Sequence, residues 1–227
     1  ALVTKKPVYL GFNMYQQITY TGKRSPFFIH LKMGADKNGK LLAMESDWTV
    51  DHGPYCEFGD ILTLRGAQFI GACYNIPNIR GKGREVATNH AWGSAFRGYG
   101  SPQSMFASEV LMDELAEKIG MDPFELGYKN IYREGSTTPT GCKPDVICLP
   151  QMFDKLRPYY EKAKKDVEEK NKNGGNKKYG MGIAILHYSS GLSGADSSEA
   201  WAEINPTGVT IGDSWEDHGQ GADIGTL

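Results

Sequence analysis

The sequence has few cysteines and no long apolar run. Its four cysteines are Cys56, Cys73, Cys142 and Cys148, and none has the C-x-x-C spacing of a zinc or thioredoxin-like site. We therefore interpret them as buried or loop thiols of a reducing compartment, the cytoplasm. No apolar stretch approaches the roughly 20 residues that a membrane-spanning helix needs, so no membrane association is expected.

An excess of charge of one sign is also absent. The chain of 227 residues carries 25 Lys and Arg against 27 Asp and Glu, a formal net charge of -2. Proteins that bind nucleic acid in general carry a marked basic excess, so we expect no nucleic-acid partner. The sequence contains no G-x-S-x-G, H-E-x-x-H or Walker A motif, which argues against a nucleophilic hydrolase.

Glycine, by contrast, is abundant, with 28 residues. We therefore expect many backbone positions that need a left-handed conformation or a close approach to another chain segment or a ligand. The first residue is Ala1, and Lys5 and Lys6 interrupt the apolar start, which does not resemble a signal peptide. The last residue, Leu227, follows a glycine-rich run. We interpret the sequence as a piece of a longer globular polypeptide.

Apolar periodicity predicts a β-rich N-terminal third. Residues 8–10 are expected to form a short strand. The apolar runs 27–33 and 41–48 flank the pair Asn38-Gly39, which is a strong hairpin signal because both residues tolerate a positive φ.

The clearest predicted helix spans Ser101–Ile119. Ser101 is expected to cap it, Pro102 suits its first turn and Gly120 ends it. Glu109 is expected on the solvent face. The apolar residues expected to form the buried face are Phe106, Val110, Leu111, Leu115 and Ile119.

Two further helices are predicted after Gly120. One begins at Asp122 with a capping box in which Glu125 reaches back to the cap. The other runs from Pro150 to about Glu169 and is expected to be broken or offset near Pro158.

A polar segment, residues 161–178, predicts a solvated helix end followed by a flexible linker. It places a domain boundary between residues 1–173 and 174–227. A buried strand over 180–186 and a hairpin formed by 200–204 and 209–211 are expected beyond it. The strands do not alternate with helices as in βαβ units, so the expected fold class is α+β, with mixed, largely antiparallel sheets and flanking helices.

Two segments combine an extended stretch, a glycine loop and the start of a helix. In the first, residues 95–103, Gly98 and Gly100 let a ligand approach the backbone, and Arg97 adds a positive charge. The free N–H groups and the positive dipole end of the following helix face this loop, which predicts a phosphate or other oxyanion site. A structural tight turn explains one such loop equally well.

The second segment, residues 218–226, departs from the dinucleotide pattern G-x-G-x-x-G because Ile224 occupies the third glycine position. His218 and Gln220 are placed to reach a bound group. Two such loops together favour a large anionic ligand such as a dinucleotide.

Longer motifs carry a family resemblance. The strings Y-N-I-P-N-I-R-G at residues 74–81 and A-F-R-G-Y-G-S-P-Q at 95–103, with the Gly219-Gln220-Gly221 loop, resemble the molybdenum hydroxylases, the xanthine dehydrogenase and aldehyde oxidase family. The resemblance covers essentially the whole chain and is greatest to the molybdopterin-cytosine-dinucleotide aldehyde oxidoreductases of sulfate-reducing bacteria. It implies that 1–173 is part of a first molybdenum-cofactor-binding domain and 174–227 the start of a second.

The resemblance also implies roles for individual residues. Gln220 would lie near an oxygen ligand of molybdenum, and no residue of this chain would bind the metal directly. The implied substrate contacts are Tyr99, Arg65 and His218; for Arg65, orienting a substrate oxygen and bonding to buried carbonyls are equally open. The implied cofactor contacts are Ala95, Phe96, Arg97, Gly98, His218, Gly219, Gln220, Gly221 and Ala222.

The implied reaction is hydroxylation of an aldehyde to a carboxylic acid, with water as the oxygen source. Electrons would pass to two [2Fe-2S] clusters in domains absent from this chain and then to a flavodoxin- or ferredoxin-like acceptor, in a homodimer. The family's catalytic glutamate has no match here, so the chain alone is expected to be inactive. A purine hydroxylase of the same family and a non-catalytic cofactor-binding or assembly subunit are the alternatives.

Overall fold

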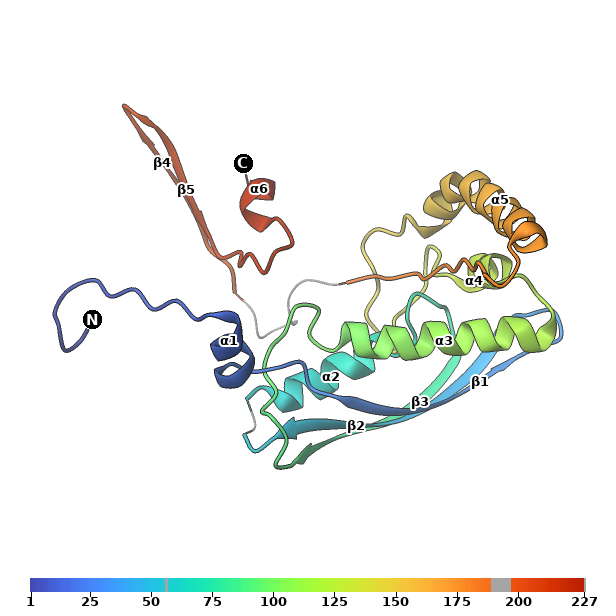
Figure 1. The fold of residues 1–227 in the computed structure, drawn as a ribbon, viewed down its shortest axis with the longest axis horizontal. Coiled ribbons are helices and arrows are strands. Elements are labelled where there is room, and N and C mark those ends of the chain that lie inside the picture. The colour runs from blue at the N-terminus through green and yellow to red at the C-terminus, as the bar shows by residue number, and fades with distance from the viewer. Residues whose placement is uncertain (56, 189–196, 227) are drawn as a thin grey trace. The chain divides into compact units, whose positions relative to one another are not determined.

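The computed structural model describes residues 1–55, 57–188 and 197–226 and contains two compact units, Ala1–His187 and Tyr188–Leu227. Each unit is described by itself. The elements of the first unit are α1 (Met14–Tyr20), β1 (Phe27–Ala35), β2 (Leu41–Gly53), α2 (Gly59–Phe69), β3 (Asn78–Ala87), α3 (Ser101–Ile119), α4 (Pro123–Asn130) and α5 (Leu149–Asn173) (Figure 1). Within the described residues, no helix is both long and apolar enough to cross a bilayer.

A three-stranded sheet in the order β1-β2-β3 forms the base of the first unit. β1 and β2 are antiparallel, as predicted from the Asn38-Gly39 pair. The side chain of Asp36 accepts hydrogen bonds from the backbone N–H groups of Asn38 and Lys40, at 2.8 and 2.9 Å. Gly39 takes the left-handed conformation, with a φ of 78°. The turn is therefore stabilised by residues next to it in sequence.

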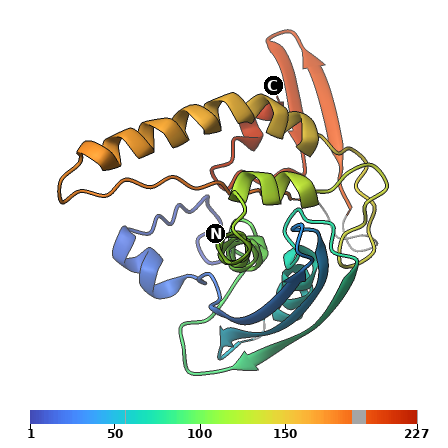
Figure 2. The same ribbon diagram turned by 90° about the vertical axis from the view of Figure 1, so that its right-hand side faces the viewer.

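β3 pairs with β2 in parallel, so the chain crosses over between them through α2; this one strand–helix–strand unit corrects the expectation that strands and helices do not alternate. Figures 1 and 2 show α2 and α3 on the same face of the sheet. This combination of a mixed sheet with helices on its side confirms the predicted α+β fold class.

The main core lies between the sheet and helices α2, α3 and α4, and the buried Asn130 connects two parts of it. Its Oδ1 accepts a hydrogen bond from Leu41 N at 2.9 Å, and its Nδ2 donates to Gly39 O at 2.8 Å. The end of α4 is thereby fixed to the β1–β2 turn. Large buried side chains of this core are Leu41, Phe69, Met105, Phe124, Leu126 and Ile131.

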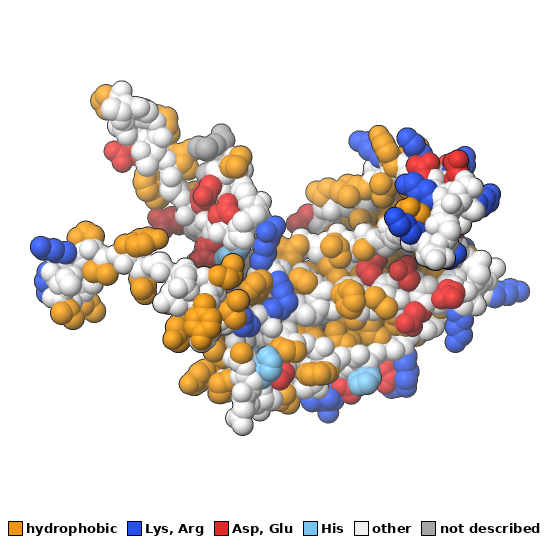
Figure 3. All heavy atoms as spheres, in the orientation of Figure 1, with side chains coloured by type: hydrophobic (Ala, Val, Ile, Leu, Met, Phe, Trp, Pro, Cys, Tyr) orange, Lys and Arg blue, Asp and Glu red, His pale blue; other side chains and the backbone are white. Residues whose placement is uncertain are grey.

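α3 has the predicted bounds, but its predicted buried face is only partly correct, since Leu115 and Ile119 pack against the core as expected. Phe106 is 72% exposed and Val110 41%, whereas Ser104, Ser108 and Glu109 are buried. The two serine hydroxyls donate to backbone carbonyls of α2 and of the residue that follows it. Serine side chains are short and can form hydrogen bonds, so serines at this interface let the two helices lie close together. Figure 3 shows apolar side chains exposed on the face of the molecule that carries α3.

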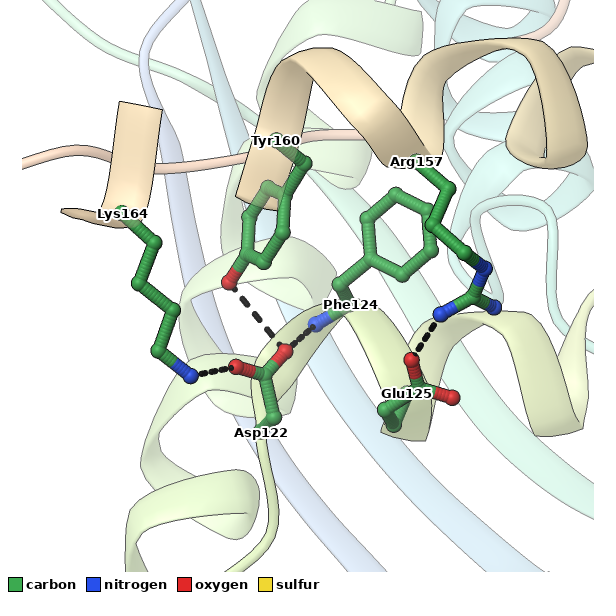
Figure 4. Close-up of polar contacts among 6 residues, drawn as sticks. All are labelled: Asp122, Phe124, Glu125, Arg157, Tyr160 and Lys164. Atoms are coloured by element: carbon green, nitrogen blue, oxygen red, sulfur yellow. Dashed lines mark hydrogen bonds and ion pairs between the residues drawn. The ribbon is translucent and has the colours of Figure 1, made fainter. Parts of the chain in front are cut away.

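Asp122 caps α4 as predicted, but Glu125 does not complete a capping box. The carboxylate of Asp122 accepts from Phe124 N at 2.9 Å and from Lys164 Nζ at 2.6 Å (Figure 4). Glu125 instead forms an ion pair with Arg157 of α5. The two acidic residues therefore connect α4 to α5.

Three other expectations are corrected. α5 runs from Leu149 to Asn173 as one helix with Pro158 inside it, so the predicted break is absent. Residues 8–10 are exposed and belong to no strand. Residues 180–186 also form no strand; in this segment Ile185 is buried against the core and no neighbouring strand pairs with the backbone.

The second unit contains the predicted hairpin, formed by the antiparallel strands β4 (Ala200–Asn205) and β5 (Gly208–Asp213). The short helix α6 (Ala222–Thr226) follows the glycine loop, where a helix start was expected.

The burial of the cysteines varies, as the interpretation of them as buried or loop thiols expects. Cys73 is buried, while Cys142 and Cys148 are exposed, and all three are free thiols. Cys56 lies outside the described residues.

Candidate anion-binding loops

The first loop, residues 95–100, enters α3 through three consecutive left-handed residues. The φ angles are 92° at Gly98, 33° at Tyr99 and 89° at Gly100. Ser101 is the first residue of α3, and the cap is Gly100, which corrects the predicted cap at Ser101. The Ser101 N–H donates to Gly98 O at 2.9 Å and so closes the turn.

Tyr99 adopts a backbone conformation that ordinarily costs a residue with a side chain about 1–3 kcal/mol. Its ring packs on the apolar cluster of Trp48, Val50 and Leu62. Its hydroxyl donates to Phe58 O at 2.5 Å, and Phe58 itself has a positive φ of 55°. Burial raises the pKa of Tyr99 to about 12, so the hydroxyl stays protonated at neutral pH. The surrounding packing thus holds the strained turn in place.

A side chain at either glycine of the first loop would meet close neighbours. A Cβ atom at Gly98 would lie 2.6 Å from Cγ of Pro102, and one at Gly100 would lie 3.2 Å from Leu62 O. The positive φ favours glycine at both positions, and at Gly98 the close approach of Pro102 favours it as well.

The side chains at the start of the first loop face outward. Ala95, Phe96 and Arg97 are exposed, and Phe96 retains 47% of its accessible area. A surface hollow of about 690 Å³ lies beside them, lined by Trp92, Ser94, Ala95, Phe96 and residues of α1 and the segment after it. The loop thus offers both side chains and backbone to a large ligand.

Arg65 of α2 lies close enough to the first loop for its charge to affect Tyr99. Its side chain is buried, its Nη1 donates to Gln68 Oε1 at 2.9 Å, and its guanidinium lies 5.8 Å from the Phe69 ring centroid. Its positive charge partly offsets the effect of burial on the pKa of Tyr99. Tyr99 and Arg65, both predicted as substrate contacts, are therefore close enough for the charge of Arg65 to affect the pKa of Tyr99.

The second loop, residues 215–222, gathers its N–H groups around Asp217, a residue that the sequence analysis missed. Gly219 and Gly221 have φ angles of 91° and 85°. The Asp217 carboxylate accepts from Gly219 N at 2.5 Å and from Asp223 N at 3.4 Å. These hydrogen bonds lower the pKa of Asp217, and the bond from Gly219 has the largest effect. These backbone donors are therefore occupied by a carboxylate of the loop itself.

His218 and Gln220 make their contacts within this loop. His218 N donates to Gln220 Oε1 at 2.5 Å, and Gln220 Nε2 donates to Glu216 O at 2.6 Å. Nε2 of His218 also lies 3.4 Å from Oε2 of Glu216. Both side chains are exposed, while Ala222 is buried at the start of α6.

The predicted cofactor residues therefore form two local groups, one in each unit. The prediction that the two loops flank one ligand stays a prediction. In the described part of the chain, no three His, Cys, Asp or Glu side chains gather as a metal site would require.

Comparison with known proteins places both groups in matched regions. The model of the molybdopterin cofactor-binding domain family matches residues 1–131, and a second model with the same description matches residues 155–227. The first match contains residues 95–100 and the second contains residues 215–222.

Individual proteins are similar over the whole chain or most of it. The aldehyde oxidoreductase of Megalodesulfovibrio gigas is 64% identical over 100% of this chain, which spans 25% of that protein. The xanthine dehydrogenase/oxidase of Felis catus is 32% identical over 81% of the chain, which spans 14% of it. The crystal structure of the aldehyde oxidoreductase from Desulfovibrio desulfuricans is 62% identical, with a TM-score of 0.84 over 95% of this chain and 24% of that one.

Proposed function

Because the chain belongs to the family of molybdopterin cofactor-binding domains, we propose that it forms part of a molybdenum-dependent aldehyde oxidoreductase. Family membership confirms the resemblance to molybdenum hydroxylases. The observation that carries the choice of aldehydes is the 64% identity along the entire chain to the M. gigas aldehyde oxidoreductase, against 32% to a xanthine dehydrogenase. A purine hydroxylase is the less supported alternative.

The first loop suits a large phosphate-bearing cofactor. Gly98 has no side chain, so a ligand can come close to the backbone there, and the exposed Arg97 supplies a positive charge. In this proposal Ala95, Phe96, Arg97 and Gly98 hold one part of the cofactor. When bound, the molybdenum cofactor supplies the two-electron oxidation of the substrate carbon.

We propose that the second loop holds another part of the cofactor through its exposed residues 218–221, because the N–H groups of Gly219 and Asp223 are already bonded to the carboxylate of Asp217. We assign the remaining cofactor contacts to residues 218–222. Gln220 adds a neutral amide, which can donate a hydrogen bond near an oxygen ligand of the metal without adding charge.

The substrate contacts proposed for Tyr99 and Arg65 follow from their environment. The Tyr99 hydroxyl is already used by Phe58 O, so its ring is the part left to form an apolar wall. Arg65 places a guanidinium in a buried position near this ring, where it suits a substrate oxygen. His218, held by Glu216, is proposed to face the substrate from the second loop.

The finer parts of the proposal rest on the family resemblance. They are the cytosine dinucleotide form of the cofactor, water as the oxygen source, two [2Fe-2S] clusters elsewhere in the polypeptide, and a flavodoxin- or ferredoxin-like electron acceptor. A homodimer in the cytoplasm and a domain boundary near residues 173 and 174 belong to the same proposal.

The test uses the full-length protein that contains this chain. We expect molybdenum and a cytosine nucleotide to be released on denaturation, and benzaldehyde to be oxidised faster than xanthine. Arg97→Gln is expected to lower the molybdenum content several-fold. Arg84→Gln, which removes an exposed charge of β3 that pairs with Asp47, is expected to leave it unchanged. Faster purine turnover would reverse the choice of substrate, and a full cofactor content without turnover would favour a non-catalytic subunit.

A further inference from the structure

Arg24, which belongs to none of the motifs noted in the sequence, contacts the first loop from the segment between α1 and β1. Its Nη2 donates to the backbone carbonyl of Arg97 at 2.5 Å, although the two residues are 73 positions apart. Its guanidinium carbon lies 4.6 Å from the centroid of the Phe96 ring. Its Nη1 lies 3.5 Å from Oε1 of Gln103, in the first turn of α3. One side chain therefore contacts the loop before and after its glycines.

The segment that carries Arg24 is itself held in place. The backbone N–H and C=O of Lys23 both form hydrogen bonds of 3.0 Å with the chain that leads into the loop. Ser25 O accepts from Gln103 Nε2 at 3.1 Å, and the buried Ser25 hydroxyl lies 2.9 Å from Nδ1 of the buried His52. The guanidinium is thus presented from a backbone fixed on both sides of it.

The contact with Arg97 O determines the direction of a donor in the loop. The carbonyl of Arg97 and the N–H of Gly98 belong to one planar trans peptide group, so they point in opposite directions. Because Arg24 fixes the carbonyl, the Gly98 N–H is fixed on the side away from Arg24. The stacking contact fixes the Phe96 ring at the same time. A ligand then meets groups that are already oriented, which lowers the entropy lost on binding.

We propose that Arg24 is a positioning residue that preorganises residues 95–100 for the anionic cofactor. The inference rests on the proposed function, since it names how that site is held in shape. Arg24 acts through the Arg97 carbonyl, the Phe96 ring and Gln103, whereas Arg97 contacts the ligand directly. Lysine can replace the charge of Arg24 but cannot stack on Phe96 and donate in two directions through a rigid planar group.

The first measurement is independent of the cofactor. Arg97 is itself a trypsin site in an exposed loop, so the rate of cleavage after Arg97 reports how firmly the loop is held. In cofactor-free full-length protein we expect Arg24→Met to be cut there about tenfold faster than wild type, as expected for loss of a charge-assisted hydrogen bond. Arg24→Lys should lie between the two, and Arg84→Met, the control, should match wild type.

The second measurement follows cofactor retention in the protein purified with its cofactor. Arg24→Met is expected to release molybdenum about tenfold faster than wild type, with a thermal midpoint of the cofactor-free protein close to that of Arg84→Met. Unchanged cleavage after Arg97 would overturn the inference. So would a thermal midpoint of Arg24→Met well below that of Arg84→Met, because faster release of molybdenum would then reflect a general loss of structure. If Arg24→Met fails to fold, Arg24→Lys decides both measurements. A wild-type protein that contains no molybdopterin contradicts the proposed function instead, while the cleavage rates still decide the role of Arg24 in the loop.

Discussion

The carboxylate of Glu109 accepts a hydrogen bond of 3.1 Å from the backbone N–H of Ile185, 76 residues later in the chain. The hydroxyl of Tyr74 donates to the same buried carboxyl. Burial raises the pKa of Glu109 to about 7, against the partial opposing effect of these hydrogen bonds. The last segment of the first unit is therefore attached to the core by a group whose charge changes near neutral pH.

This attachment gives a pH-dependent stability. The folded-state pKa of Glu109 lies above its ordinary value of 4.5, so its favourable contribution is complete below about pH 4.5 and is lost as the pH rises through about 7. The difference amounts to about 3 kcal/mol. We expect Glu109→Gln, which stays neutral, to remove this dependence, so that the variant gains stability relative to wild type between pH 5 and pH 8. Urea unfolding across that range measures it.

The matched control for this prediction is Glu114→Gln, which removes an exposed carboxylate from the same helix. The change in the free energy of unfolding caused by Glu109→Gln must vary with pH far more than the change caused by the control. Parallel pH profiles for wild type and Glu109→Gln would contradict the prediction.

Gly98→Ala tests the shape of the first loop. The new Cβ would lie 2.6 Å from Pro102 Cγ in a residue with a φ of 92°. We expect a loss of about 1–3 kcal/mol in the free energy of unfolding, together with a lower molybdenum content of the full-length protein. Gly182→Ala is the control, because a Cβ at Gly182 meets nothing within 4 Å and its φ is not left-handed. Equal effects of the two substitutions would show that the loop tolerates a side chain.

Ser104→Leu tests the close packing of α3 on α2. Ser104 is completely buried, and its hydroxyl donates to Gly66 O at 3.0 Å, so a leucine must push the helices apart and leave that carbonyl without its partner. We expect a destabilisation of about 2–4 kcal/mol in denaturant unfolding. Glu114→Leu adds the same side chain on an exposed position of α3, with an expected change within about 0.5 kcal/mol. A similar result for both would mean that the interface is loosely packed.

The parts of the fold predicted correctly are those fixed by neighbouring residues. Asp36, Asn38 and Gly39 form the β1–β2 turn among themselves, and Asp122 caps the helix that starts next to it. The buried face of α3 was predicted only in part, with Leu115 and Ile119 correct, because spacing identifies a helix but not its partner. Here the partner is α2, whose backbone carbonyls favour serine over larger apolar residues.

The residues of the candidate site also divide into those that local sequence could predict and those that it could not. The glycine loops and Arg97 could be recognised because glycine at closely spaced positions before a helix has a local physical meaning. Asp217 had a usable signal, an acidic residue two positions before Gly219, whose N–H it accepts. Arg24 had none, because its partners at Phe96, Arg97 and Gln103 become neighbours only when the sheet and α3 are assembled.

The parallel pairing of β2 and β3 has a consequence for the order in which the sheet assembles. β1 and β2 are joined by a short turn and can pair as soon as residue 53 has been synthesised, while β3 must wait for residues 54–77, including α2, to cross over. During translation, β2 therefore has one edge with unsatisfied backbone groups until residue 87 emerges. That temporary edge leaves the nascent chain open to mispairing with another chain or to capture by a chaperone.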